Sequence, residues 1–361
     1  MRAAGLRYNG ETFAWECACP TRRGFLRGLG ATLAAAPIGA FAGTPPPRAI
    51  DTHHHIYPPK YTAENLQRIV ADIAIAPGSF YTSWSPQAAL EKMDRAGVSA
   101  AINSMSSPGV WFNDGEAGRA RARECNEFGA ELIADYPGRF GMFAAIPLPD
   151  IEGSLREIAY ALDTLKLDGI GLLTSYDGKL LGHPAFAPVL LELNRRKTVV
   201  FVHPTMSCCG NVTPGVRSAT LEFPMDTTRV IVDLVMSGGF AAYPDIRFIF
   251  SHGGGMLLPI VNRVQSLLNA LKPEDRGAKV PGGLEATLRR SFYDLASVGF
   301  NRPAMAGLRE LLPVSQMLYG SDEPFNSTVA LTESVGKLGF SEAEMAAVRR
   351  GNALGLFPRL G

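Results

Sequence analysis

The segment AIDTHHHIYPPKY, residues 49–61, carries three of the chain's six histidines directly after an aspartate and an apolar lead. Successive side chains of an extended strand point to opposite faces. In such a strand His53 and His55 share a side with Asp51, whereas His54 points the other way. The paired imidazoles can therefore hold one metal ion, and we expect His54 to be a structural residue and not a ligand.

Three further polar residues each follow an apolar run: His203 in FVHPT, His252 in FIFSHGGG and Asp322 in LYGSDEPF. Imidazole and carboxylate ligands suit zinc, and also manganese or iron, so we expect one divalent metal with zinc as the first choice. The expected ligands His53, His55, His203 and Asp322 leave one position of a catalytic metal open. His252 then remains as an acid or base, because imidazole titrates near neutral pH; its alternatives are a fifth ligand or a hydrogen bond to a ligand.

Short apolar stretches alternate with amphipathic segments along most of the chain. Strands are predicted at 48–54, 98–105, 139–147, 168–174, 198–204, 246–252, 291–297 and 315–321. Helices are predicted between them, including one at 85–97 with Ser85 as its N-cap. Strands that alternate with helices pair in parallel through crossovers, and eight units predict an α/β fold, a (β/α)8 TIM barrel with a single catalytic domain. The carboxyl ends of barrel strands meet at one mouth, where the five residues above would converge.

An open doubly wound sheet is the alternative architecture. That fold usually carries a glycine-rich turn after its first strand, whereas here the first strand ends in histidines and prolines. The later HGGGM sequence lacks the order G-x-G-x-x-G. Its glycines leave room for a substrate near the backbone, or they form a tight turn.

Residues 1–42 differ from the rest of the chain. Arg22 and Arg23 precede an alanine-rich apolar run, and Ala40 and Ala42 in the sequence Ala-Phe-Ala are the small residues that a signal peptidase accepts. The segment resembles a twin-arginine export signal and predicts a periplasmic protein, with a cytoplasmic protein as the alternative. Residues 43–48 are interpreted as a linker and 49–361 as the catalytic domain. The apolar run is too short to span a membrane, so no integral membrane segment is expected after signal removal.

Composition excludes one class of partner. The formal net charge is +1, and no run of lysine or arginine is long enough to follow a phosphate backbone, so we expect no nucleic acid. Beyond residue 42 only Cys125, Cys208 and Cys209 remain, without the spacing of a disulfide framework or a zinc finger. We assign Cys208 and Cys209 no role.

The motifs IDTHHHIYPP, FVHPT, FIFSHGGG and LYGSDEPF, in this order, resemble the amidohydrolase superfamily. Within it they are similar to the branch of α-amino-β-carboxymuconate-ε-semialdehyde, 6-methylsalicylate and γ-resorcylate decarboxylases, and the similarity runs from about residue 49 to the C-terminus. The resemblance implies a metal-dependent TIM barrel in which His53, His55 and His203 are ligands, His252 is catalytic, and Asp322 touches the metal and relays a proton.

The resemblance also implies residues that bind substrate. Arg263, eleven residues after His252, matches an arginine that reaches a neighbouring subunit's substrate carboxylate, which implies a homodimer. Phe325 matches an aromatic residue near the substrate, and Trp84 matches a tryptophan that follows a substrate-binding arginine. The segment APGSFYTSW has no basic residue at that place, so a flatter aromatic acid is expected in place of the semialdehyde. Aromatic side chains could hold its ring: Phe80, Tyr81, Trp84, Trp111 and Phe112.

Two reactions fit such a site. The first is non-oxidative decarboxylation of an aromatic or unsaturated carboxylic acid, with protonation by His252 or Asp322. The second is hydrolysis of a lactone or amide by a metal-activated water. The segment DGIGLLTSY offers no lysine to bridge two metals, so one metal is expected. The branch resemblance favours the decarboxylase.

Overall fold

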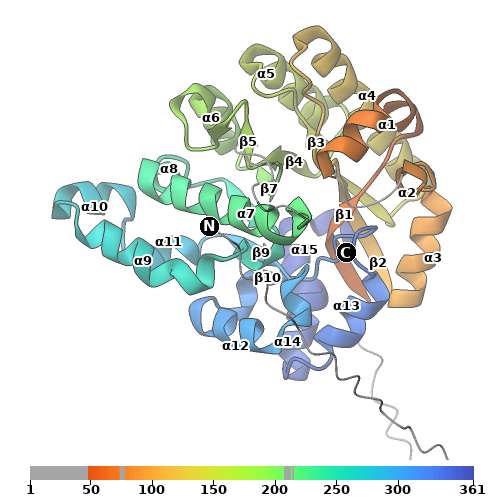
Figure 1. Ribbon diagram of the computed structural model, residues 1–361. Coiled ribbons are helices and arrows are strands. Elements are labelled where there is room, and N and C mark those ends of the chain that lie inside the picture. The colour runs from red at the N-terminus through yellow and green to blue at the C-terminus, as the bar shows by residue number, and fades with distance from the viewer. Residues whose placement is uncertain (1–47, 74–77, 207–212, 214) are drawn as a thin grey trace, which may run out of the picture. The chain divides into compact units, whose positions relative to one another are not determined.

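The computed structural model describes residues 48–73, 78–206, 213 and 215–361 (Figure 1). The predicted export signal at 1–42 lies outside the described residues, and so do Cys208, Cys209 and the predicted linker except Arg48. Those assignments stay predictions.

Eight parallel strands of the described chain form one sheet in the order β1-β2-β3-β4-β7-β8-β9-β10, and helices surround it (Figure 1). The barrel strands are β1 (Ala49–His55), β2 (Val98–Ser104), β3 (Phe140–Ala145), β4 (Gly169–Leu173), β7 (Val199–His203), β8 (Arg247–Phe250), β9 (Phe292–Asp294) and β10 (Met317–Leu318). A small antiparallel pair, β5 (Ser175–Tyr176) and β6 (Lys179–Leu180), lies in the loop after β4. Each predicted strand has its counterpart, and the expected (β/α)8 TIM barrel is confirmed.

Backbone hydrogen bonds bring the two ends of the sheet together. The Thr52 N–H donates to the Tyr319 carbonyl at 2.9 Å, and the Asp322 N–H donates to the His53 carbonyl at 2.7 Å. The His55 N–H donates to the Glu323 carbonyl at 2.8 Å. Because these bonds join β1 to the segment after β10, Asp322 is held beside the two histidines of β1.

Fifteen α-helices lie within the described ranges. They are α1 (Pro59–Ile73), α2 (Gly78–Thr82), α3 (Pro86–Ala96), α4 (Gly115–Asp135), α5 (Ile151–Ala159), α6 (Ala187–Arg195), α7 (Ser218–Ser237), α8 (Gly239–Ala242), α9 (Leu257–Asn269), α10 (Pro273–Lys279), α11 (Leu284–Leu288), α12 (Arg302–Leu311), α13 (Thr328–Val335), α14 (Glu342–Ala346) and α15 (Asn352–Leu356). Helix α3 shows why such segments fold: the Ser85 hydroxyl accepts the Ala88 N–H, as predicted, and Gly97 ends the helix with φ of 67°. No helix in the described ranges combines the length and apolar character needed to cross a membrane.

The core has two layers. One lies between the strands and the surrounding helices. The other is an apolar cluster to which the barrel strands contribute alternate residues and the C-terminus contributes four: Ile50, Ala100, Ile102, Phe143, Val199, Phe201, Ile249, Leu318, Ala353, Leu356, Phe357 and Leu360. We call this second cluster the interior layer.

Candidate metal centre and active site

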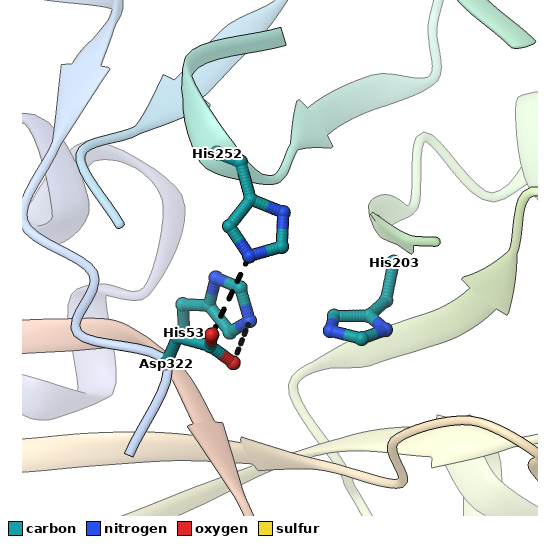
Figure 2. A group of neighbouring side chains, drawn as sticks. All are labelled: His53, His203, His252 and Asp322. Carbon is teal, nitrogen blue, oxygen red and sulfur yellow. Dashed lines mark hydrogen bonds and ion pairs between the residues drawn. The ribbon is translucent and has the colours of Figure 1, made fainter. Parts of the chain in front are cut away.

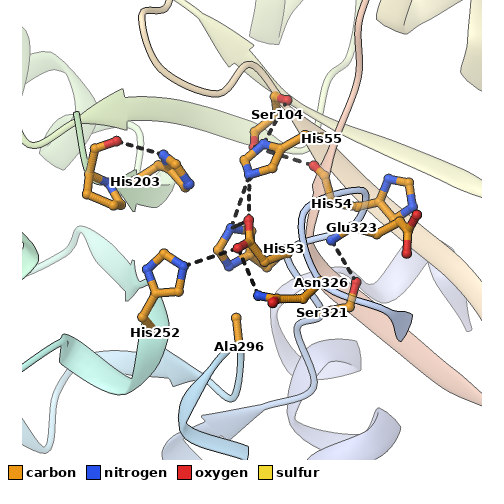
Figure 3. Close-up of polar contacts among 12 residues, drawn as sticks. His53, His54, His55, Ser104, His203, His252, Ala296, Ser321, Glu323 and Asn326 are labelled. Carbon is orange, nitrogen blue, oxygen red and sulfur yellow. Dashed lines mark hydrogen bonds and ion pairs between the residues drawn. The ribbon is translucent and has the colours of Figure 1, made fainter. Parts of the chain in front are cut away.

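An irregularity in β1 turns its histidines toward the barrel interior. Ile50 belongs to the interior layer, so uninterrupted alternation would turn His54 inward. The pairing of β1 with β2 instead shifts register between Asp51 and His54. His53 and His55, which share a side, consequently face inward with their Nε2 atoms 3.2 Å apart, and His54 lies away from them (Figure 3).

Asp51 supports this irregular backbone. Its Oδ1 accepts the His53 N–H at 3.1 Å and the Ser321 N–H at 2.9 Å, and its Oδ2 accepts the Ser321 hydroxyl at 2.5 Å. Burial raises the pKa of Asp51 to about 7, although these hydrogen bonds act in the opposite direction. Asp51 therefore braces β1 against the segment that follows β10.

His203, His252 and Asp322 come from three other strand ends. His203 ends β7 and continues the inward series of Val199 and Phe201. His252 follows β8, and Asp322 follows β10. One ligand atom from each of His53, His203, His252 and Asp322 lies within 4.8 Å of the others (Figure 2).

His55 adjoins the same group. Its Nε2 lies 3.1 Å from Oδ1 of Asp322, which is also 3.2 Å from Nε2 of His53. All the histidines and the aspartate predicted for the site therefore meet at the mouth of the barrel, as the strand-end argument requires.

In three of the histidines, Nδ1, the ring nitrogen that points away from the centre, lies within hydrogen-bond distance of an oxygen. Nδ1 of His53 lies 2.9 Å from Oδ2 of Asp294, Nδ1 of His55 lies 3.3 Å from the Ser104 carbonyl, and Nδ1 of His203 lies 2.8 Å from the Pro204 carbonyl. Carbonyl and carboxylate oxygens accept, so we assign the proton to each Nδ1. In the neutral form of each ring, Nε2 then has a lone pair that faces the centre, which is how metal-binding histidines are commonly oriented.

His252 is held differently. Its Nε2 lies 3.5 Å from Oδ2 of Asp322, and its buried Nδ1 has no hydrogen-bond partner in the described chain. Its backbone is fixed, because its N–H donates to Oδ1 of Asp294 at 3.0 Å and its φ is 56°. An imidazole without a partner on Nδ1 suits proton transfer better than permanent ligation.

The electrostatics fit a site that receives a cation. Burial lowers the pKa of His55, and burial with the neighbouring charges of His55 and His53 holds the pKa of His203 well below its usual range. Burial also lowers the pKa of His53, but the charges of Asp294 and Asp322 outweigh it and raise the pKa to about 10. Burial raises the pKa of Asp322, yet His53 and the hydrogen bonds from the histidines hold it well below its usual range. Without a cation, Asp322 is thus a carboxylate that lies beside a protonated His53 and the neutral imidazoles of His55 and His203.

Asp294, the last residue of β9, was not predicted from the sequence as a site residue. It binds Nδ1 of His53 and accepts the N–H of His252 at 3.0 Å and of Ala296 at 2.9 Å. It lies inside the strand predicted at 291–297, so the strand-end rule points to Ser297 and not to Asp294. The paired strand ends at Asp294 instead, and the available signal was that Asp294 is the one charged residue of that predicted strand.

The site opens into a cavity of about 220 Å³. Its lining residues are Ser106, His203, Arg217, Ala219, Thr220, Phe223, Pro224, His252, Ser297, Asp322, Phe325 and Asn326. Three of them have φ near +60° although they are not glycines: His252, Ser297 and Asp322. Backbone of this kind costs free energy and gathers at functional sites.

The predicted substrate-binding residues lie in different places. Phe325 lines the cavity, and its ring centre is 5.6 Å from that of His55. Trp84 packs against Phe128 and does not line it. Arg263 is exposed on α9, outside the cavity lining of its own chain. The other aromatic candidates are also outside it: Phe80 and Tyr81 pack on Phe325, and Trp111 and Phe112 line a separate depression.

The glycines after His252 form a tight turn. Gly253, Gly254 and Gly255 all have positive φ, which side chains disfavour. A Cβ at Gly255 would lie 2.1 Å from the Pro224 carbonyl oxygen. Because none of the three lines the cavity, the turn interpretation fits, and these glycines let α7 approach the strand end.

The donor set fits one divalent metal. His54 takes no part, since its Nδ1 lies 3.0 Å from Oδ1 of Asn103 on the side away from the other histidines (Figure 3). At the end of β4, Leu173 is apolar and the Thr174 hydroxyl donates to Asp226, so no lysine stands there to bridge two metals. When bound, the cation would be held by His53, His55, His203 and Asp322.

Known proteins resemble the chain over most of its length. A family model described as amidohydrolase matches residues 50–359. Decarboxylase yanB of Aspergillus niger is 37% identical over 334 residues, which cover 86% of this chain and 87% of that protein. The 6-methylsalicylic acid decarboxylase acuB of Aspergillus aculeatus is 33% identical over 324 residues, which cover 86% of this chain and 96% of that protein.

Solved structures share the fold. A 5-carboxyvanillate decarboxylase from Novosphingobium aromaticivorans, complexed with manganese and 4-hydroxy-3-methoxy-5-nitrobenzoic acid, has a TM-score of 0.75 and 21% identity. The match covers 86% of this chain and 96% of that chain. The resemblance predicted from the four motifs is confirmed, and the chain belongs to the amidohydrolase family.

Proposed function

We propose that the protein is a metal-dependent carboxy-lyase that removes the carboxyl group from an aromatic or unsaturated carboxylic acid without oxidation. The decarboxylase class predicted from the motifs is confirmed by relatives that are themselves decarboxylases. The observation that carries the mechanism is the position of His252, which lines the cavity with Nε2 3.5 Å from Asp322.

The reaction needs one proton at one carbon. The bond between the ring carbon and the carboxyl carbon breaks, its electron pair stays on the ring carbon, and that carbon takes a proton as carbon dioxide leaves. A bound divalent cation supplies positive charge that orients the acid and stabilises developing negative charge. His252 donates the proton from within the cavity, and Asp322 can relay one to it.

A deuterium experiment tests this assignment. Metal-loaded protein is incubated with hydroxybenzoic acids and with small lactones in heavy water, and products are identified by mass spectrometry. We expect carbon dioxide and one deuterium at the carbon that lost the carboxyl group, whereas ring opening of lactones alone would overturn the proposal. His252→Asn should lower kcat by roughly 10²- to 10⁴-fold. The control His183→Asn, at an exposed loop histidine, should leave kcat unchanged.

For the metal, we propose zinc first and manganese or iron as alternatives. Three imidazoles and a carboxylate are typical of zinc, and the same donors suit manganese. Manganese is present in the 5-carboxyvanillate decarboxylase complex. Metal analysis of protein purified without added metal, followed by reloading with each ion, would decide between them.

The cavity supports a small aromatic acid as substrate. Its volume of about 220 Å³ is below the range typical of drug-sized ligands, and Ala219, Phe223, Pro224 and Phe325 provide apolar walls. The relative acuB decarboxylates 6-methylsalicylic acid, a single-ring acid. Substituted salicylates are therefore the first acids to screen.

A homodimer is also proposed. Four of the large exposed apolar side chains lie on α7, on α9 or directly before α9: Leu221 (43% exposed), Met225 (43%), Met256 (39%) and Leu267 (49%). Arg263 lies on α9 in this region. An exposed apolar face rimmed by charge is typical of a protein interface. Sedimentation of wild type and of Leu267→Glu should show a dimer and a monomer respectively; a monomeric wild type would contradict the proposal.

Export to the periplasm remains a proposal that rests on residues 1–42. Twin-arginine signals carry folded proteins, which agrees with a barrel that binds its metal before transport. A fusion of residues 1–45 to a reporter should appear in the periplasm, and retention in the cytoplasm would remove the claim. Replacement of Arg22 and Arg23 by lysine is the matched control and should abolish export.

A further inference from the structure

The side chain of Arg217 lines the cavity, and no role has been assigned to it above. Arg217 directly precedes α7, and its side chain is exposed at the cavity. Its guanidinium makes no hydrogen bond or ion pair with another residue of the described ranges. Among the lining residues it is the one whose side chain is always positively charged, since imidazoles titrate and guanidinium does not.

We infer that Arg217 recognises the carboxylate of the substrate from within the same chain, and so distinguishes the acid from its decarboxylated product. The inference rests on the proposed function, because that function makes the substrate an anion and leaves the product without this charge. Arg263, expected to act from a neighbouring subunit, does not line this cavity. Arg217 needs no second subunit to reach it.

The charges around the cavity support this role. Asp322 lines it with a carboxylate whose Oδ1 lies 3.1 Å from Nε2 of His55. A negative substrate entering this cavity meets that charge. Phe223, Pro224 and Phe325 form apolar walls, which offer a carboxylate no hydrogen bond.

The exposed position of Arg217 also suits the reaction. A cation that bound the reacting carboxylate tightly would stabilise the substrate more than the transition state, in which the negative charge moves from the carboxylate to the ring carbon as neutral carbon dioxide leaves. Solvent screens an exposed guanidinium, so its attraction selects anions without holding them strongly. The product lacks the carboxylate, so Arg217 no longer attracts it and the product dissociates more readily.

An uncharged polar group of the cavity, the hydroxyl of Ser106, can bind a different part of the substrate. Ser106 is buried, and its hydroxyl is left without a hydrogen bond of normal geometry among the described residues. A phenolic hydroxyl, which substrate and product share, can pair with it. The carboxylate is therefore the group by which Arg217 separates the two.

Binding by an inert ligand pair tests the inference without turnover. Calorimetry on the metal-loaded full chain would compare benzoate with phenol, using wild type, Arg217→Gln and Arg217→Lys. We expect Arg217→Gln to weaken benzoate binding by about tenfold, the size of a partly screened charge-assisted hydrogen bond, and to leave phenol binding within twofold. Arg217→Lys should lie between wild type and Arg217→Gln, and added salt should weaken benzoate binding mainly in wild type.

Arg302→Gln is the matched control, because Arg302 is exposed at the start of α12 and does not line the cavity. It should bind both ligands like wild type. Equal benzoate affinity in wild type and Arg217→Gln, or an equal loss for phenol, would overturn the inference. If no acid is decarboxylated while the benzoate difference persists, the proposed function fails and anion recognition by Arg217 stands. If decarboxylation occurs without that difference, only the inference fails.

Discussion

The two ends of the barrel use the same strands for opposite purposes. The carboxyl end gathers buried imidazoles and carboxylates, including His53, His203 and Asp294, whereas the interior layer holds only apolar side chains. Burying polar groups costs free energy unless each is paired, and burying apolar groups contributes about 25 cal/mol per Å². The interior layer therefore stabilises the fold, so that the mouth can keep groups that are poised for chemistry.

The two regions meet at Phe201. Its ring centre lies 4.9 Å from that of His53 and 5.2 Å from that of Phe143, with which it stacks. Phe357, from the C-terminal segment, packs edge-on against Phe143 at 5.7 Å. The floor beneath the proposed metal ligands is therefore a stack of aromatic rings, and substitutions on either side of it should separate function from stability.

Removal of a ligand should give the largest effect. We expect His203→Ala to lower kcat/KM by more than about a thousandfold, since even groups that only orient ligands change metal affinity or activity by roughly 10- to 100-fold. The metal content of the purified protein should fall, while the unfolding free energy of the metal-free protein changes little. Metal analysis and chelator-treated denaturation curves check both. His183→Ala, at an exposed loop histidine, is the control, and full metal content in His203→Ala would contradict the ligand assignment.

A substitution in the interior layer should do the reverse. Phe357→Ala removes a buried ring and should lower the free energy of unfolding by about 3–5 kcal/mol. The kinetic constants per folded molecule should stay near those of wild type, because Phe357 does not line the cavity. Urea denaturation and assays normalised to the folded fraction measure this. Phe300→Ala, at a phenylalanine that is 43% exposed, should cost less than about 0.5 kcal/mol.

Asp294→Asn tests the boundary between the regions. Asp294 is fully buried, orients His53 through Nδ1 and fixes the backbone of His252. Loss of its charge should weaken metal affinity by roughly 10- to 100-fold. Competition with a fluorescent chelator measures the change. Asp233→Asn, whose carboxylate also accepts a backbone N–H but lies outside the cavity lining, should leave metal affinity unchanged; a loss as large there would mean that the effect is not specific to the site.

The sequence predicted the barrel well because apolar stretches of barrel strands are short and separated by turns and helices. The last two strands are the exceptions. The strand predicted at 291–297 is paired only over Phe292–Asp294, and the one at 315–321 only over Met317–Leu318. The chain leaves the sheet early at both places, and Ser297 and Asp322 then take positive φ at the cavity.

The site residues at strand ends were also predictable, since order along the chain implies convergence in a barrel. Two features were not. Alternation gives the side on which His53 and His55 lie together but not which side faces inward, because the register shift in β1 depends on Asp51 and its bonds to Ser321. Arg217 lies in a loop, where no periodic pattern indicates the direction of a side chain.

The smallest effect on activity is expected for an ion pair that lies next to Asp322 in the chain but outside the cavity. Lys92 on α3 forms an ion pair with Glu323, whose other oxygen accepts the Thr328 hydroxyl at 3.0 Å. The side chain of Lys92 is 40% exposed and that of Glu323 is 5% exposed. Because Glu323 follows Asp322 directly, the pair could serve catalysis or only the seam between β10 and β1. Its position outside the cavity lining favours the second role.

Lys92→Met should therefore lower the unfolding free energy by about 1 kcal/mol, since the partly exposed pair is screened and the remaining carboxylate keeps its bond from Thr328. The value of kcat should stay within about threefold of wild type. Glu323→Gln and the double variant complete a cycle, in which a coupling energy in stability and none in kcat assigns the pair to the fold. Lys60→Met, which removes an exposed partner of Glu124, should change neither quantity. If Lys92→Met lowered kcat as strongly as His252→Asn, the division between the chemical mouth and its structural surroundings would have to be redrawn to include α3.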